Sequence, residues 1–153
     1  MSISDLETRH FFTLKGYEPF FDLFSKSRYP WELLPEIAPF IAALGPQLSK
    51  DKYDLLKEGV WVAKSARIAD YATILGPAII GEEVELRPGA FIRSHVYVGP
   101  HSVVGNSSEL KNVILIGWAE VPHFNYVGDS ILSYGAHLGA GAITSNLRAD
   151  RQA

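Results

Sequence analysis

Aliphatic residues recur at every sixth position through much of the second half of the chain. Ten successive hexads begin with an aliphatic residue: Val62, Ile68, Ile74, Ile80, Leu86, Ile92, Val98, Val104, Leu110 and Ile116. The fifth position of most of these hexads is small. A helix with 3.6 residues per turn cannot hold every sixth residue on one face over this length, whereas short strands joined by tight corners can. The pattern therefore predicts a mainly β fold in which each strand adds one aliphatic side chain to a continuous core.

The N-terminal part of the chain, positions 1–58, follows a helical pattern instead. Apolar residues fall on one helical face between Leu33 and Leu44, and Gly45 with Pro46 is a typical helix end. Ser4 and Glu7 have the spacing of a capping box, and a short third helix is predicted from about Asp51 to Lys57. We therefore expect a helical N-terminal cap over residues 1–58, followed by a β domain over residues 59–153.

The hexads resemble those of the hexapeptide-repeat family, whose fold is a left-handed parallel β-helix of triangular section. The resemblance implies three hexads per coil. Because solenoids need covered ends, we expect the helical cap to lie over the N-terminal end of the prism.

The hexad register changes near residues 121–130, VPHFNYVGDS. Counted from Ile116, the next aliphatic residues, Val121 and Val127, come one residue early, and Leu132 follows after a step of five. We interpret these two slips as an excursion of the backbone over residues 122–126 that points His123 outward. Irregular segments on rigid scaffolds are common places for function.

Composition narrows the possible functions. The net charge is −3 with no basic stripe, so a nucleic-acid partner is not expected. The chain has no cysteine, which excludes disulfides, thiolate metal sites and cysteine nucleophiles. No secretory signal pattern and no apolar run of about 20 residues is present, so we expect a cytoplasmic protein without a membrane partner.

Three segments carry a more specific resemblance: LRPGA at residues 86–90, GNSSELK at 105–111, and HFNYVGDS with LGAGAITSN from 123 onward. They are similar to the acetyltransferase domain of the bifunctional glucosamine-1-phosphate acetyltransferases and N-acetylglucosamine-1-phosphate uridyltransferases, a family related to UDP-N-acetylglucosamine pyrophosphorylases. The similarity covers roughly residues 62–152. It does not extend to the nucleotidyltransferase half, whose glycine-rich nucleotide loop is absent from residues 1–58.

The resemblance implies an acetyl-CoA-dependent N-acetyltransferase acting on an amino-sugar phosphate in nucleotide-sugar precursor synthesis. It identifies His123 as the catalytic base and Asn146 as the residue that positions the amine and acetyl group. Arg87 and Lys111 would hold the sugar phosphate, and Tyr126 would contact the substrate. His137 stands where the family usually has an asparagine that touches the sugar.

The resemblance also implies acetyl-CoA as co-substrate, no metal, and a homotrimer with sites between neighbouring prisms. Relatives continue for several coils after the asparagine loop, so we expect the β domain to be C-terminally incomplete.

Two alternatives stay open. The chain could be a non-catalytic sugar-phosphate-binding or assembly subunit. It could also be a metal-dependent hydratase, because His95 and His101 both fall at the fourth position of their hexads. Such a site needs three convergent imidazoles.

Overall fold

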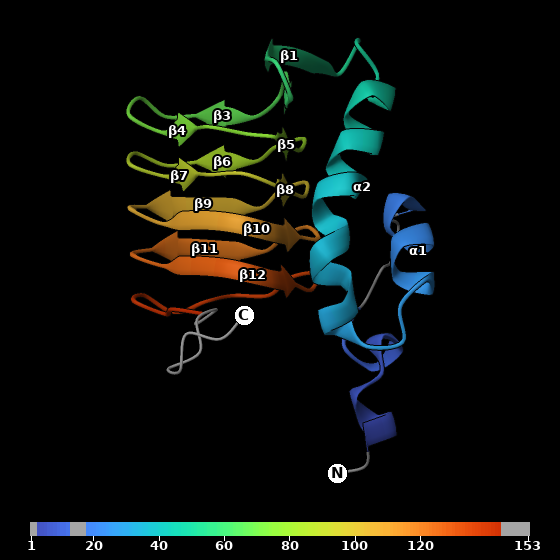
Figure 1. Ribbon diagram of the computed structural model, residues 1–153. Coiled ribbons are helices and arrows are strands. Elements are labelled where there is room, and N and C mark those ends of the chain that lie inside the picture. Colours follow the sequence, from blue (N-terminus) through green and yellow to red (C-terminus); the bar gives the residue numbers. More distant parts are fainter. Residues whose placement is uncertain (1–2, 13–17, 145–153) are drawn as a thin grey trace.

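The computed structural model describes residues 3–12 and 18–144, and its main body is a stack of β coils with helices along one side (Figure 1). The strands are short and follow one another around the stack. Their bounds are β1 Tyr53–Lys57, β2 Val60–Ala63, β3 Arg67–Ile68, β4 Thr73–Ile74, β5 Ala78–Ile80, β6 Glu85–Leu86, β7 Phe91–Ile92, β8 Val96–Val98, β9 Val103–Asn106, β10 Glu109–Leu115, β11 Glu120–His123 and β12 Tyr126–Leu132.

Parallel ladders join equivalent strands of successive coils into three faces. The first, here called the cap face, contains β2, β5, β8 and the C-terminal halves of β10 and β12. The β11 face contains β3, β6, β9 and β11. The β7 face contains β4, β7 and the N-terminal halves of β10 and β12. The structure thus confirms the predicted left-handed parallel β-helix.

The interior of the prism is a column of aliphatic side chains. Most of the predicted hexad positions lie in it, including Ile80, Leu86, Ile92 and Val104, which are all fully buried. Burying side chains of this size contributes about 1.5–3 kcal/mol each relative to the exposed state. The column therefore sets the register of every coil.

The coils become shorter by a single position within β10. Paired residues of the early coils are three full hexads apart in the sequence, as Phe91 and Glu109 are. Glu109 and its partner in the next coil, Tyr126, are separated by one residue fewer. The step from one inward residue to the next is five between Leu110 and Leu115, and it is five again between Val127 and Leu132. Both slips thus occur at the same corner of successive coils.

This register corrects one sequence-based interpretation. Leu115, not Ile116, points into the prism, and Ile116 is buried in the cluster beneath the cap. From Leu115 the inward residues follow at regular steps of six to Val121 and Val127. The first slip therefore lies in β10 and not next to residue 122, and the predicted excursion over residues 122–126 is wrong because Val121 and Val127 are one regular hexad apart.

The N-terminal region consists of helices, as predicted, with a strand at its end. The helices are η1 Ile3–Leu6, η2 Thr8–His10, α1 Glu18–Ser25, η3 Pro30–Glu36, α2 Ile37–Leu44 and η4 Gly45–Gln47. The predicted third helix is wrong, because Tyr53–Lys57 forms β1, which pairs antiparallel with β2. Burial and then the nearby Glu82 carboxylate raise the pKa of Tyr53, on this strand.

The cap packs against a side of the prism, not over its end. Figure 1 shows α2 running alongside the stack of coils, and α2 contacts β8 and β10 while η3 contacts β12. Outward-pointing residues of the cap face meet it; these are Trp61, Ile79, Tyr97, Ile114 and Ile131. The expectation of a cap over the N-terminal end is therefore wrong, because the apolar side of the cap packs against these outward-pointing residues of the cap face.

No helix of the described residues is long and apolar enough to cross a membrane.

The close approach of successive coils makes Gly105 essential to the stack. A Cβ atom at this position would overlap the backbone of Pro122 in the next coil, whereas one at Gly139 would meet no heavy atom within 4 Å. We expect Gly105→Ala to lower the free energy of unfolding by about 3 kcal/mol or more, since overpacking forces the backbone to shift. Gly139→Ala is the matched control and should change stability by about 0.5 kcal/mol at most. Urea unfolding followed by circular dichroism measures both, and equal midpoints would contradict the stacking described.

Candidate functional site

His123 lies at a regular corner between the β11 face and the β7 face. It ends β11 and pairs in register with Asn106 of the coil below. The next residue, Phe124, has a positive φ of 52°. Equivalent corner residues of other coils share this conformation; they are Tyr71, Gly89, Ser107 and Gly141. The side chain of His123 is exposed, as the sequence predicted, but it lies at a corner with the same backbone conformation as those of the other coils.

Asn125 fixes the backbone of this corner. Its side chain is 3% exposed, and its Oδ1 accepts a hydrogen bond from the His123 backbone N–H at 3.0 Å. Its Nδ2 donates to the carbonyl oxygens of Gly139, at 2.8 Å, and Ala142, at 3.3 Å. The Asn125 backbone N–H donates to Ser108 Oγ of the coil below. Asn125 therefore joins three coils at the corner that presents His123.

Two cations lie one above the other where the β7 face meets the cap face. Leu110 pairs with Ile92, so the residues that follow them, Lys111 and Arg93, occupy equivalent positions in successive coils. Tyr126 lies on the same face and pairs with Glu109. Sequence reasoning did not assign Arg93 to the site, although its spacing of one coil from Lys111 was a usable signal.

Each of these cations faces a carboxylate. Arg93 Nη1 lies 2.8 Å from Glu109 Oε1, and Lys111 Nζ lies 3.8 Å from Asp129 Oδ2. Asn112 Nδ2 donates to Asp129 Oδ1 at 2.8 Å. These pairs hold the two cations near the prism wall.

Asn112 also connects this corner with the cap. Its Nδ2 lies 3.3 Å from the carbonyl oxygen of Leu34 in η3. The corner of β10 where the coil loses one residue is therefore the corner that meets the cap.

Arg87 lies at a different corner. Its Nε is 2.7 Å from Glu85 Oε1 on the β11 face, and it lines a shallow cavity of about 300 Å³ together with Arg67. Arg87 and Lys111 thus follow strands of neighbouring faces, and the cation stacked with Lys111 is Arg93.

His137 forms a pair with Glu120. The two residues are bridge partners in successive coils of the β11 face, and His137 Nδ1 lies 2.9 Å from Glu120 Oε2. Both side chains are about half exposed. Asn146, the other predicted catalytic residue, lies outside the described residues.

The two histidines considered for a metal site lie at different corners, because His95, in the coil below, is equivalent to Asn112 and His101 is not. His101 stacks on Trp118 with ring centroids 4.4 Å apart. Over residues 3–12 and 18–144 no group of three or more histidine and acidic side chains is arranged to hold a metal ion.

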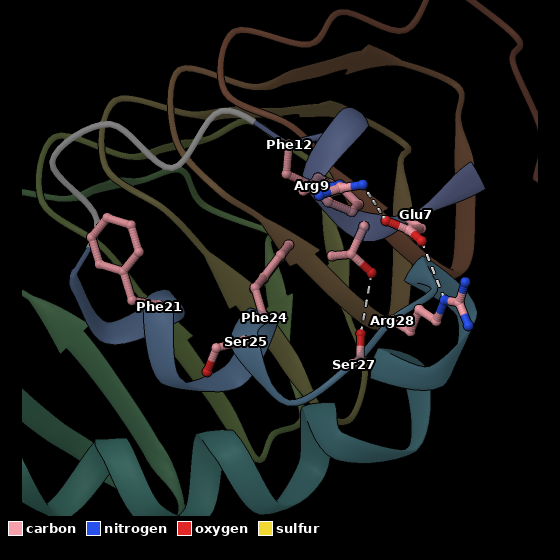
Figure 2. A pocket seen from close by; sticks show the side chains of 9 residues that line it. Glu7, Arg9, Phe12, Phe21, Phe24, Ser25, Ser27 and Arg28 are labelled. Carbon is pink, nitrogen blue, oxygen red and sulfur yellow. Dashed lines mark hydrogen bonds and ion pairs between the residues drawn. The ribbon is translucent and has the colours of Figure 1, made fainter. Parts of the chain in front are cut away.

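A larger cavity lies within the cap, away from the predicted site. Figure 2 shows its apolar wall of Phe12, Phe21 and Phe24, with Glu7 between Arg9 and Arg28 at the rim. It measures about 360 Å³. None of the residues predicted to act on a substrate lines it.

Comparison with known proteins supports the predicted resemblance. The bifunctional protein GlmU of Methanococcus vannielii is 32% identical over 129 residues, which are 79% of this chain and 30% of that protein. The GlmU of Methanocaldococcus jannaschii is 43% identical over 63 residues, 41% of this chain and 15% of the relative. The chain resembles the GlmU proteins. No protein-family model matches it.

A third relative has a similar double name. The bifunctional sugar-1-phosphate nucleotidylyltransferase/acetyltransferase of Sulfurisphaera tokodaii is 31% identical over 103 residues, 56% of this chain and 26% of that protein. The chain thus matches less than a third of the length of each of these relatives. The similarity and the β-helical fold support a transferase related to sugar-phosphate acetyl- and nucleotidyltransferases.

Asn125 and Asn106 provide a matched pair of variants for the corner. Asn125→Ala removes the partner of buried backbone groups, so we expect a loss of about 2–3 kcal/mol in the free energy of unfolding. Asn106 is exposed, and its Nδ2 makes one hydrogen bond to the Pro88 carbonyl. Asn106→Ala should therefore lower stability by less than about 1 kcal/mol. Chemical unfolding of the two variants tests this, and an equal loss would contradict a special role for Asn125.

Proposed function

We propose that the chain transfers an acetyl group from acetyl-CoA to the amine of an amino-sugar phosphate of the glucosamine-1-phosphate type. The amine nitrogen attacks the thioester carbonyl, a C–N bond forms, and the C–S bond breaks to release the coenzyme A thiolate. His123 takes the proton that the nitrogen loses, and this proton can pass to the thiolate. A homotrimer and a role in nucleotide-sugar precursor synthesis belong to the same proposal.

The observation that carries this proposal is the placement of His123. An imidazole suits general-base work near neutral pH because its two ring nitrogens can accept and donate protons. His123 is exposed on a corner whose backbone Asn125 fixes. No described side chain makes a hydrogen bond or ion pair to its ring, so the ring is available to a substrate.

The two stacked cations support a phosphate-bearing substrate. Arg93 and Lys111 lie on the β7 face, and Tyr126 lies on this face between them and the His123 corner. Fixed guanidinium and ammonium groups bind phosphate through charge-assisted hydrogen bonds. We therefore assign the phosphate to Arg93 and Lys111, with Arg87 outside this group.

The alternative is a non-catalytic subunit that binds sugar phosphates. Both functions require the same exchange, because Arg87, Arg93 and Lys111 each lie within 4.0 Å of a carboxylate that a phosphate would have to displace. The first test below separates the two functions.

His123→Ala tests the catalytic proposal. Loss of the base should lower the rate of acetyl transfer about 100-fold or more. The measurement is thiol release from acetyl-CoA in the presence of glucosamine-1-phosphate and a panel of other amino sugars. His101→Ala, another exposed histidine at a prism corner, is the control and should retain the rate. Wild-type release no greater than that of His123→Ala across the panel would favour the non-catalytic alternative.

The cations make a second prediction. Arg93→Ala and Lys111→Ala should each raise KM for the sugar phosphate about tenfold, because each removes a charge-assisted hydrogen bond. Arg87→Ala should change KM less than twofold by the same reasoning, since it removes no contact with the phosphate. Steady-state kinetics with varied sugar phosphate measures all three. A larger increase in KM for Arg87→Ala than for Arg93→Ala would instead assign the phosphate to the corner between the β11 and β7 faces.

A further inference from the structure

The cavity within the cap combines an apolar wall with a charged rim (Figure 2). Phe12, Phe21 and Phe24 form the wall, and the rings of Phe12 and Phe24 meet edge to face with their centroids 4.8 Å apart. The cavity volume of about 360 Å³ is more than twice the roughly 150 Å³ of a cavity that holds benzene. One aromatic ring with a short substituent therefore fits this space.

The charged residues that line the cavity sum to one positive charge. Glu7 Oε2 lies 2.8 Å from Arg9 Nη2, and Glu7 Oε1 lies 3.2 Å from Arg28 Nε. One carboxylate thus holds two guanidinium groups, and both Nη groups of Arg28 keep N–H donors that no described residue accepts from. Glu32 does not line the cavity, and its Oε2 accepts from the backbone N–H groups of Arg28 and Tyr29. The rim therefore suits a ligand with one negative charge.

Two hydroxyl groups also line the cavity. Thr8 is 5% exposed, and its Oγ1 lies 3.3 Å from Ser27 Oγ. Ser27 Oγ donates to the carbonyl oxygen of Tyr29 at 3.1 Å, so the proton shared by the two hydroxyls comes from Thr8. Sites for small molecules typically have an apolar wall and a few polar groups that orient the ligand, and this cavity has both.

We propose that this cavity binds a small aryl carboxylate, a molecule with one aromatic ring and a carboxylate on a short chain. The ring packs among the three phenylalanine rings, where edge-to-face contacts are favourable. The carboxylate accepts hydrogen bonds from the Nη groups of Arg28, because the guanidinium fork matches the geometry of a carboxylate. A single negative charge balances the rim, which a phosphate dianion would overcompensate. The site lies apart from the proposed acetyl-transfer site, since neither His123 nor Lys111 lines it.

Isothermal titration calorimetry with phenylacetate tests this site. Phenylacetamide keeps the aromatic ring and loses the charge, whereas acetate keeps the charge and loses the ring. We expect phenylacetate to bind about tenfold more tightly than phenylacetamide, as one charge-assisted hydrogen bond to a guanidinium group allows. Acetate should show no saturable binding, because it has no ring to fill the apolar part of the cavity.

Arg28→Ala and Arg67→Ala form a matched pair of variants. The two arginines are 64% and 63% exposed, and each lies 3.2 Å from a glutamate, but Arg67 is on the prism. Arg28→Ala should weaken the binding of phenylacetate about tenfold and leave the affinity for phenylacetamide unchanged. Arg67→Ala should keep the preference for the carboxylate. Thermal unfolding of both variants confirms that the fold is retained.

A variant of the wall tests the apolar part of the site. Phe21 is 50% exposed, so its ring can be removed without opening a gap in the core. Phe21→Ala should weaken the binding of phenylacetate and phenylacetamide by the same factor, because both ligands present the same ring to the wall.

The outcomes of these titrations are independent of the proposed function. Absence of saturable binding of phenylacetate, or equal affinities for phenylacetate and phenylacetamide, overturns the site even if acetyl transfer is measured. An equal loss of affinity in Arg28→Ala and Arg67→Ala overturns it as well. A preference for the carboxylate that Arg28→Ala removes and Arg67→Ala keeps supports the site even if the wild type transfers no acetyl group.

Discussion

The inward column of aliphatic side chains is the constraint on which the other features of the prism depend. Each coil must present an aliphatic residue at the same height on each face, because a polar residue there would be buried without a partner. Because the corner of β10 is one residue shorter, the next inward residue is Leu115. The residues from there to the second slip, between Val127 and Leu132, are displaced by one position relative to a strict repeat of three hexads. The positions of Glu120, His123 and Tyr126 all follow from that single step.

The cap then decides which surfaces of the prism are available. It covers the face formed by β2, β5, β8 and the second halves of β10 and β12, where the outward residues are apolar. The outward side chains of the β11 and β7 faces include the ion pairs described above. His123 lies at the corner between these two faces. His123 therefore lies between Glu120, at the start of its own strand, and Tyr126, at the start of β12.

Much of the fold could be predicted because burial within a solenoid repeats at a fixed period. The sequence was less informative where two different environments both require an apolar residue. Leu115 and Ile116 are both aliphatic and fully buried, yet the first packs inside the prism and the second beneath the cap. Hydrophobicity cannot distinguish these environments, so the register error began there. The apolar residues at 61, 79 and 97, spaced by one coil, did carry a signal for the position of the cap.

The acidic partner of His137 follows from the second slip, the step of five between Val127 and Leu132. In a coil of three full hexads the residue above Glu120 would be Leu138, and His137 would lie one position off the column. The shortened coil brings Glu120 and His137 into register, and their side chains meet at 2.9 Å. Arg93 and Lys111 lie before the shortened corner, so their spacing of three full hexads still applies. Predicting contacts between coils of such a prism therefore depends on locating each shortened corner first, since residue identity alone leaves the partner undetermined.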